Sequence, residues 1–294
     1  EHYANYNWFG RPEWTEPCAV VDSFLLAFGL WKHTGSIAYL EDAHAILYNG
    51  LSYGQRPNGG FGCDRCAGAE DAYLSPRDDL FEAPWCCSMR GGDGLASAAL
   101  SLYVRDERGV TLPLYNDSEL AEEETDGRRW TIRQETEYPF AGVVRLKIAE
   151  ADGAASRRLR LYVPSWCGKG EASIALNGER VPFVTVGSFA ELDRVWRAGD
   201  VLELRFPVPL RTAAVNNERH RANGSALRHG VLALGAATDE AKLNVASLKP
   251  LGGAKYKDEA NGTVYGPLTD FTAMAEADAV GDRRRLLFAV DGAG

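Results

Sequence analysis

The chain has 294 residues, 45% of them hydrophobic and 25% charged, which are the proportions of an ordinary globular protein with two or three domains. Its formal net charge of −9 argues against nucleic-acid binding, because nucleic-acid-binding proteins present a basic surface. No apolar run approaches the roughly 18 residues that a membrane-spanning helix needs, so we expect no membrane partner.

Three helices are expected in the first part of the chain. Pro17 fits the first position of a helix, where its fixed φ and missing N–H do no harm, and the apolar run 19–31 continues that helix. Apolar residues at helical spacing predict a second helix over 37–53, which forms an αα-hairpin with the first. Residues 54–85 resemble a loop, and a third helix is expected over 93–103.

From residue 110 the pattern changes to short alternating runs separated by Asp-Gly, Asn-Gly and Gly-Asp turns. Strands are expected at 110–115, 130–135, 143–148, 159–163, 172–176 and 201–206. This spacing is typical of an antiparallel β-sandwich. After residue 210 the pattern weakens, with strands expected at 229–234 and 285–290 and a long loop over 246–266.

The chain has six cysteines, five of which lie in its first third: Cys18, Cys63, Cys66, Cys86, Cys87 and Cys167. Adjacent cysteines do not readily bridge each other, so the pattern favours metal binding or catalysis over structural disulfides. Thiols without disulfides slightly favour a cytoplasmic location. The sequence starts at Glu1 with neither an initiator methionine nor a signal peptide, so we expect it to begin inside a longer precursor.

Four side chains together have the composition of a zinc site: Glu16, Cys18, Cys86 and Cys87. Three sulfurs and one carboxylate oxygen suit tetrahedral Zn²⁺. Glu16 and Cys18 are two positions apart, so they can converge only if Glu16 precedes the helix, and Pro17 favours that boundary. Cys86 and Cys87 are likewise expected to need a turn or an extended backbone.

Other interpretations of the cysteines stay open. A structural zinc site with four protein ligands would leave no open position for chemistry. Cys63 and Cys66 form a CxxC that could join Cys86 and Cys87 in an all-cysteine zinc site, or could remain free thiols in a loop. A redox role for the CxxC is disfavoured because no βαβ pattern surrounds it. Cys167 is expected to be a small buried hydrophobic residue.

Six short segments follow one another in a recognisable order and spacing: Glu16-Pro17-Cys18, Cys86-Cys87, Gln134–Phe140, Leu161–Trp166, Asn177-Gly178 and Val195–Asp200. Through these segments the chain resembles the cysteine-dependent β-L-arabinofuranosidase family of glycoside hydrolases, up to about residue 235. It departs from the family pattern at two places. Pro17 stands where the family has Thr, and Ser88-Met89-Arg90 replaces Pro-Pro-Asn.

The resemblance implies a fold of mixed class, an (α/α)6 barrel followed by β-sandwich domains. Residues 1–105 would be the end of the barrel, 106–210 a β-sandwich, and 211–294 a second, smaller β unit. The rest of the barrel would precede Glu1, so its missing N-terminal segment, in the same protein or a companion chain, is an expected partner. The first helices should then expose apolar surface unless that segment covers it.

The resemblance also implies a retaining hydrolysis of L-arabinofuranosides or related sugars, with Cys86 as nucleophile and Glu1 as acid/base. His2, Tyr3 and Trp85 would line the sugar pocket. The implied cofactor is a zinc ion held by Glu16, Cys18, Cys86 and Cys87. The alternative function is a non-catalytic carbohydrate-binding or scaffold protein in which the zinc is structural.

Overall fold

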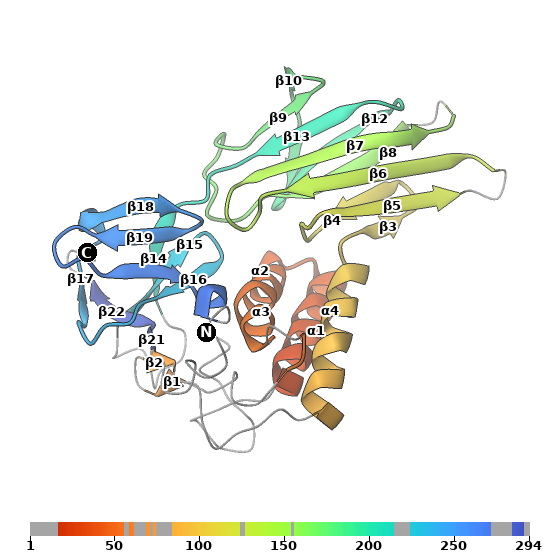
Figure 1. Ribbon diagram of the computed structural model, residues 1–294. Helices are drawn as coiled ribbons and strands as arrows, with labels where there is room; N and C mark the ends of the chain where they lie inside the picture. The colour runs from red at the N-terminus through yellow and green to blue at the C-terminus, as the bar shows by residue number, and fades with distance from the viewer. Residues whose placement is uncertain are drawn as a thin grey trace. The chain divides into compact units, whose positions relative to one another are not determined.

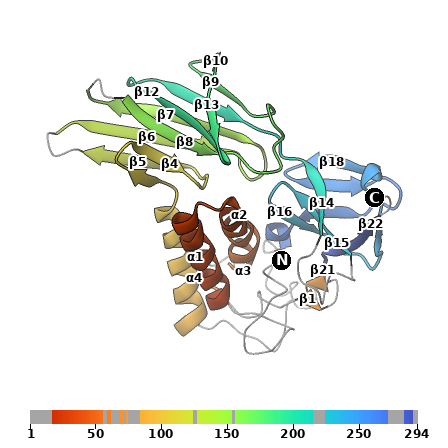
Figure 2. The same ribbon diagram turned by 180° about the vertical axis from the view of Figure 1, so that it is seen from behind.

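The computed structural model describes residues 17–55, 59–61, 69–70, 73–74, 84–123, 127–153, 156–214, 224–271 and 284–290. The chain is a mixed structure of helices and several sheets (Figures 1 and 2). It divides into two compact units, one formed by residues 1–97 with 209–294 and the other by residues 98–208. In the part of the chain that the structure describes, no helix is long and apolar enough to cross a membrane.

The first unit begins with the predicted pair of helices. Helix α1 (Pro17–Thr34) buries an apolar side that ends in Phe24, Phe28 and Trp31. It stops at Gly35, whose φ of +70° suits glycine and whose amide bonds to the Trp31 carbonyl. The second predicted helix is confirmed as three successive segments, which are α2 (Ile37–Ala45), the π-helical η2 (Ile46–Leu51) and α3 (Ser52–Gly54).

The third predicted helix begins earlier than expected. Helix α4 (Met89–Leu100) follows a π-helical turn, η4 (Pro84–Ser88), so Cys86 and Cys87 lie in helical backbone, and the expected turn or extended conformation is wrong. Gly91 and Gly94 lie inside α4 because neighbouring side chains approach them closely. These glycines permit packing rather than a bend, which is why the sequence pattern was misleading there.

The C-terminal part of the first unit is an eight-stranded sheet. Its main strand order is β17-β22-β15-β16-β20-β19-β18, and β14 pairs with β15. The strands are β14 (Leu210–Ala214), β15 (Ser225–His229), β16 (Leu232–Gly235), β17 (Lys242–Leu243), β18 (Leu248–Gly252), β19 (Lys255–Asp258), β20 (Val264–Pro267) and β22 (Leu287–Val290). A small sheet joins β1 (Ala69–Glu70), β2 (Tyr73–Leu74) and β21 (Arg284–Arg285).

The long loop expected over 246–266 is wrong. That stretch holds β18, β19 and the start of β20, with 3-10 turns on either side at η5 (Val245–Ser247) and η6 (Leu268–Phe271). The alternation escaped the sequence pattern because an inward-facing position of β19 is the polar Asp258, which is buried beside Tyr256. A positive φ at Gly252, Gly253 and Ala254 makes the tight connection between β18 and β19.

The helices and the C-terminal sheet of the first unit are linked by a buried amide. The Asn49 side chain in η2 donates to the Val231 carbonyl at 3.1 Å and accepts from the Ala233 amide at 2.7 Å. Nearby, Tyr53 of α3 and Leu268 form a buried apolar cluster. These contacts explain why residues 209–294 belong to the same compact unit as the first helices.

The second unit contains a six-stranded sheet, β10-β9-β13-β7-β6-β5, and a five-stranded sheet, β11-β12-β8-β4-β3. The strands are β3 (Val104–Asp106), β4 (Gly109–Leu112), β5 (Ser118–Glu123), β6 (Arg129–Thr136), β7 (Val143–Ala151), β8 (Ser156–Tyr162), β9 (Ser173–Leu176), β10 (Glu179–Val181), β11 (Val184–Val186), β12 (Phe189–Val195) and β13 (Val201–Arg205). Neighbouring strands are antiparallel except β4 and β8, which are parallel. The six strands predicted between 110 and 206 are all present.

Both sheets of this unit carry fully buried apolar side chains, and one side-chain contact joins them. Ile132 and Leu146 of one sheet and Leu159 of the other are fully buried. The Arg157 guanidinium on β8 lies 4.7 Å from the ring centre of Trp130 on β6, which brings the sheets into contact.

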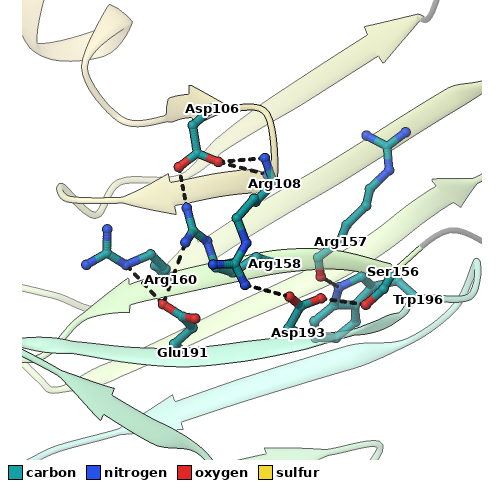
Figure 3. A network of polar contacts seen from close by, with 10 residues as sticks. Asp106, Arg108, Ser156, Arg157, Arg158, Arg160, Glu191, Asp193 and Trp196 are labelled. Atoms are coloured by element: carbon teal, nitrogen blue, oxygen red, sulfur yellow. Dashed lines mark hydrogen bonds and ion pairs between the residues drawn. The ribbon is translucent and has the colours of Figure 1, made fainter.

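The opposite side of β8 carries a network of ion pairs (Figure 3). Arg160 and Arg158 both reach Glu191 on β12, with the Arg160 Nε 3.4 Å from Glu191 Oε2. Arg158 also pairs with Asp106 on β3. At the start of β8, the Ser156 hydroxyl donates to Asp193. The network joins β3, β8 and β12 across the face of the five-stranded sheet, and it accounts for two of the three arginines of β8, Arg158 and Arg160.

Candidate metal and catalytic site

Two helical segments bring three cysteine sulfurs together. Cys18 is the second residue of α1, and Cys86 and Cys87 lie in η4. The three Sγ atoms lie within 4.8 Å of one another. The Cys86 and Cys87 sulfurs are 3.5 Å apart, which is too far for a disulfide bond of about 2.05 Å. The sequence prediction that these three thiols converge is therefore confirmed.

The π-helical turn explains how adjacent cysteines can point the same way. A π-helix closes its hydrogen bonds from i to i+5, so its turn is wider than that of an α-helix and successive side chains differ less in direction. Pro84 begins this turn, and α4 continues from Met89. Such single π-turns occur frequently at functional sites.

Phe61, from a second segment, contacts the end of the π-helical turn η4. The Ser88 hydroxyl accepts from the Phe61 amide at 3.1 Å and donates to the Phe61 carbonyl at 3.2 Å. The Phe61 ring is buried against Gly91, where a Cβ would come within 2.2 Å of the ring. Backbone and ring together fix the η4–α4 junction, and with it the cysteine pair.

The three sulfurs differ in their access to solvent. Cys87 is fully buried, Cys18 is half-buried, and Cys86 is exposed. A pocket of about 430 Å³ opens at this point and is lined by Cys18, Cys86, Met89, Arg90 and Asp93. Cys86 is therefore the sulfur of the adjacent pair that a molecule in the pocket would meet.

A cation lies beside the sulfurs. Arg90 forms ion pairs with Asp22 on α1 and with Asp93 on its own helix. The hydrogen bond to Asp22 is the largest cause that raises the pKa of Arg90 above its usual value, so the guanidinium is charged at any physiological pH. Sequence analysis missed these three residues. A signal was present, because Asp22 follows Cys18 and Arg90 follows Cys86 by one helical turn each.

The sulfur spacing fits a tetrahedral metal ion. Two sulfurs bound to zinc at about 2.3 Å lie roughly 3.8 Å apart. The 3.5 Å between Cys86 and Cys87 is close to that value, and 4.8 Å bounds the distances to Cys18. Thiolates are soft ligands that suit zinc. The cluster can thus hold a metal ion with little rearrangement.

Several predicted site residues lie outside the described part of the chain: Glu1, His2, Tyr3, Glu16, Cys63 and Cys66. Trp85 is the second residue of η4.

Cys167 is half-buried in the turn after β8, so the prediction of a buried residue is wrong. Partial burial is the main cause that raises the pKa of the Cys167 thiol, and the nearby Glu171 adds to it. This cysteine lies in the second unit, away in sequence from the cluster.

Comparison with known families finds a match in the second unit. Residues 109–208 match the middle domain of the glycoside hydrolase family 127 (GH127) β-L-arabinofuranosidases. The resemblance predicted from the sequence is confirmed by this match, and no curated protein sequence matches the chain.

Similarity to solved structures extends over nearly the whole of this chain. A glycoside hydrolase has a TM-score of 0.76 at 21% identity, over 95% of this chain and 52% of that one. The GH127 β-L-arabinofuranosidase from Geobacillus stearothermophilus T6 has a TM-score of 0.70 at 22% identity, over 94% and 50% of the two chains. A further GH127 β-arabinofuranosidase gives 0.70 at 19% identity, over 95% and 50%. These similarities show the fold, and the chain spans about half the length of each structure.

Proposed function

We propose that this GH127 chain is part of a retaining glycoside hydrolase that acts on β-L-arabinofuranosides or closely related sugars. The observation that carries the proposal is the convergence of Cys18, Cys86 and Cys87, from two distant segments, beside a pocket that exposes Cys86. The GH127 match and the glycoside hydrolases among the similar structures support the same reaction class.

The proposed cofactor is a zinc ion held by Cys18, Cys86 and Cys87, with Glu16 as the fourth ligand. Zinc would supply a positive charge that keeps the coordinated thiols deprotonated at neutral pH. The buried position of Cys87 suits a residue that serves as a ligand alone. The exposed position of Cys86 suits a residue that also reacts with substrate.

The proposed reaction has two steps. The Cys86 sulfur attacks the anomeric carbon and forms a thioglycosyl bond, while the Glu1 carboxyl gives its proton to the departing glycosidic oxygen. The Glu1 carboxylate then takes a proton from water, whose oxygen displaces the sulfur and releases the sugar with its original anomeric configuration. His2, Tyr3 and Trp85 are proposed to line the pocket that holds the sugar.

We further propose the architecture in which this chemistry occurs. Residues 1–105 would be the end of an (α/α)6 barrel, 106–210 a β-sandwich and 211–294 a second β unit. The rest of the barrel would come from a further segment of the same protein or a companion chain. The coverage of about half of each similar structure supports this arrangement, as does the exposure of Leu26 on α1 and Met89 on α4.

The test combines metal analysis with activity measured on the intact protein. We expect about one zinc per chain and hydrolysis of a chromogenic β-L-arabinofuranoside. Cys86→Ser should abolish turnover, and Glu1→Gln should lower kcat by about 10²- to 10⁴-fold, the usual contribution of acid/base catalysis. Cys167→Ser is the matched control, because it also replaces a thiol but lies in the other unit, and it should leave both zinc content and kcat unchanged.

The same experiment separates the scaffold alternative. A protein that binds zinc and loses thermal stability on chelation, yet hydrolyses none of a panel of pentosides, would be a zinc-stabilised carbohydrate-binding or scaffold protein. A protein that retains no zinc through purification and is still hydrolytically active would contradict the proposed cofactor.

A further inference from the structure

The two segments that carry the sulfurs also meet one helical turn further on. Asp22 follows Cys18 by four residues on α1, and Arg90 follows Cys86 by four residues on the continuous η4–α4 segment. Residues four apart lie on the same face of a helix. The Arg90–Asp22 ion pair therefore repeats, one turn away, the contact that the sulfurs make between the same two segments.

A third contact continues this series. Gly94, one further turn along α4, has no room for a side chain, because a Cβ there would come within 2.6 Å of Val21 Cγ2 on α1. Along η4–α4, the sulfurs, the ion pair and the glycine contact α1 at successive turns. On α1 the corresponding residues are Cys18, Asp22 and Val21, so the ion pair and the glycine meet α1 at the same turn.

The contacts of Arg90 divide into two kinds. Its Nε lies 3.1 Å from Asp22 Oδ1, and its Nη2 reaches the same oxygen, so two donors of the guanidinium cross to the other helix. Its Nη1 instead pairs with Asp93, three residues on in the same helix. Asp22 therefore links two segments, whereas Asp93 only orients the guanidinium.

We propose that Arg90 and Asp22 are positioning residues that set the distance of Cys18 from Cys86 and Cys87. The side chains are 34% and 63% exposed, so their pairing contributes little to the stability of the fold. The bond lengths of a zinc–thiolate site are defined to within about 0.2 Å, so a small change in how the two segments approach each other lowers its metal affinity. The inference rests on the proposed zinc-binding function.

The test uses Co²⁺ as a visible probe in the full chain, because sulfur-to-cobalt charge-transfer absorption reports the number of bound thiolates. Arg90→Leu and Asp22→Asn should each weaken Co²⁺ binding about two- to fivefold, the range that one exposed ion pair can supply, and lower the absorption per cobalt. The double variant should be no weaker than the poorer single variant, because both remove the same link.

Asp93→Asn is the matched control. Like Asp22→Asn, it removes one negative charge that is paired with the Arg90 guanidinium, but it leaves the link between the helices intact. Binding and spectrum should therefore stay at the wild-type values. Arg90→Lys keeps the positive charge but lacks the planar guanidinium that donates two hydrogen bonds to Asp22. Its Co²⁺ affinity should therefore lie between those of the wild type and Arg90→Leu. The melting temperature of the metal-free protein should be the same in all variants, which distinguishes positioning from a general loss of structure.

The outcomes for this inference and for the proposed function are separate. Wild-type protein that gives no sulfur-to-cobalt band would contradict the zinc–thiolate site itself. Wild-type protein with a strong band, but with Asp22→Asn and Asp93→Asn equal in affinity and spectrum, would overturn the positioning role alone. Additive losses in the double variant would also overturn it, because the two residues would then act independently.

Discussion

Gly91 and Gly92 are adjacent in α4 but occupy opposite environments. A Cβ at Gly91 would overlap the buried ring of Phe61, while a Cβ at Gly92 would meet nothing within 4 Å. Phe61 also exchanges hydrogen bonds with Ser88, next to the cysteine pair. A single methyl group at one of these two positions should therefore disturb the support of the candidate site, and at the other it should not.

We expect Gly91→Ala to destabilise the chain by about 1–3 kcal/mol, the usual cost of overpacking a tightly packed core. Gly92→Ala should instead stabilise it by up to about 1 kcal/mol, because alanine is the better residue in an exposed helical position. Urea unfolding of both variants measures the difference, and each serves as the control of the other. Equal effects would mean that Phe61 does not pack on α4 as described.

At the scale of elements, two of the short motifs that indicated the family, Asn177-Gly178 and Val195–Asp200, form turns that are hydrogen-bonded to each other. Asn177 and Gly178 form the two-residue loop between β9 and β10, each with positive φ. The Asn177 side-chain amide donates to Asp200 Oδ1 at 2.9 Å, and the Arg197 backbone amide donates to Asp200 Oδ2 at 2.9 Å. Two motifs separated in sequence are thus one hydrogen-bonded cluster.

The pKa of Asp200 gives this cluster a pH dependence. Burial acts to raise that pKa, but the hydrogen bonds from Asn177 and the Arg197 amide, together with the positive charges of Arg194 and Arg197, outweigh it, so the pKa lies below the ordinary aspartate value. The folded state therefore binds this proton less tightly than the unfolded state does. The resulting stabilisation is full above the unfolded pKa of about 3.9 and is lost as pH falls through the lower, folded value.

We expect Asp200→Asn to destabilise the chain by about 1–2 kcal/mol at pH 7, because an amide can accept only one of the two hydrogen bonds. The loss should shrink as pH falls below about 4, because the unfolded wild-type chain binds the proton first and the carboxylate of the folded chain follows at lower pH. Urea unfolding at pH 7 and pH 3 measures both limbs. Asp152→Asn is the control. The exposed Asp152 carboxylate accepts one hydrogen bond, from the Arg129 backbone amide, so its replacement should have a smaller effect on stability at pH 7. A loss that is constant with pH would contradict the assigned role of the carboxylate.

Periodicity explains which elements could be predicted from the sequence. The apolar spacing of α1 and the alternation of β7 each follow a single regular pattern, and both elements are predicted correctly. β5 alternates between exposed and half-buried residues without a fully buried side, so it gave no apolar signal.

The convergence of Cys18 with Cys86 was predictable from the chemistry of the residue types. The π-helical turn was not, because it depends on the distant contact of Ser88 with Phe61.

At the scale of the whole molecule, the family match and the candidate chemistry lie in different units. The match covers residues 109–208, within the second unit, whereas the three clustered sulfurs belong to the first. The match thus reflects strand packing and turn geometry in a unit that contributes no sulfur to the cluster. Evidence for the proposed reaction must therefore come from the first unit, whose integrity depends on the joint between its helices and its C-terminal sheet.

The Asn49 side chain is the polar part of that joint. Its carboxamide satisfies the Val231 carbonyl and the Ala233 amide, which flank the start of β16, and it lies 3% exposed. Replacing it with a leucine of similar volume would leave both backbone groups without their partner in a region shielded from water. Each such group costs about 1–3 kcal/mol.

We therefore expect Asn49→Leu to destabilise the chain by about 2–4 kcal/mol and to speed hydrogen exchange at the Ala233 amide. Asn261→Ala is the matched control, because that asparagine caps a single backbone amide at the surface and should cost no more than about 1 kcal/mol. Urea unfolding and amide exchange together give the test. If exchange at Ala233 stays slow while stability falls, the loss arises within the helices. If both stay at wild-type values, the helices and the C-terminal sheet are not joined through this amide.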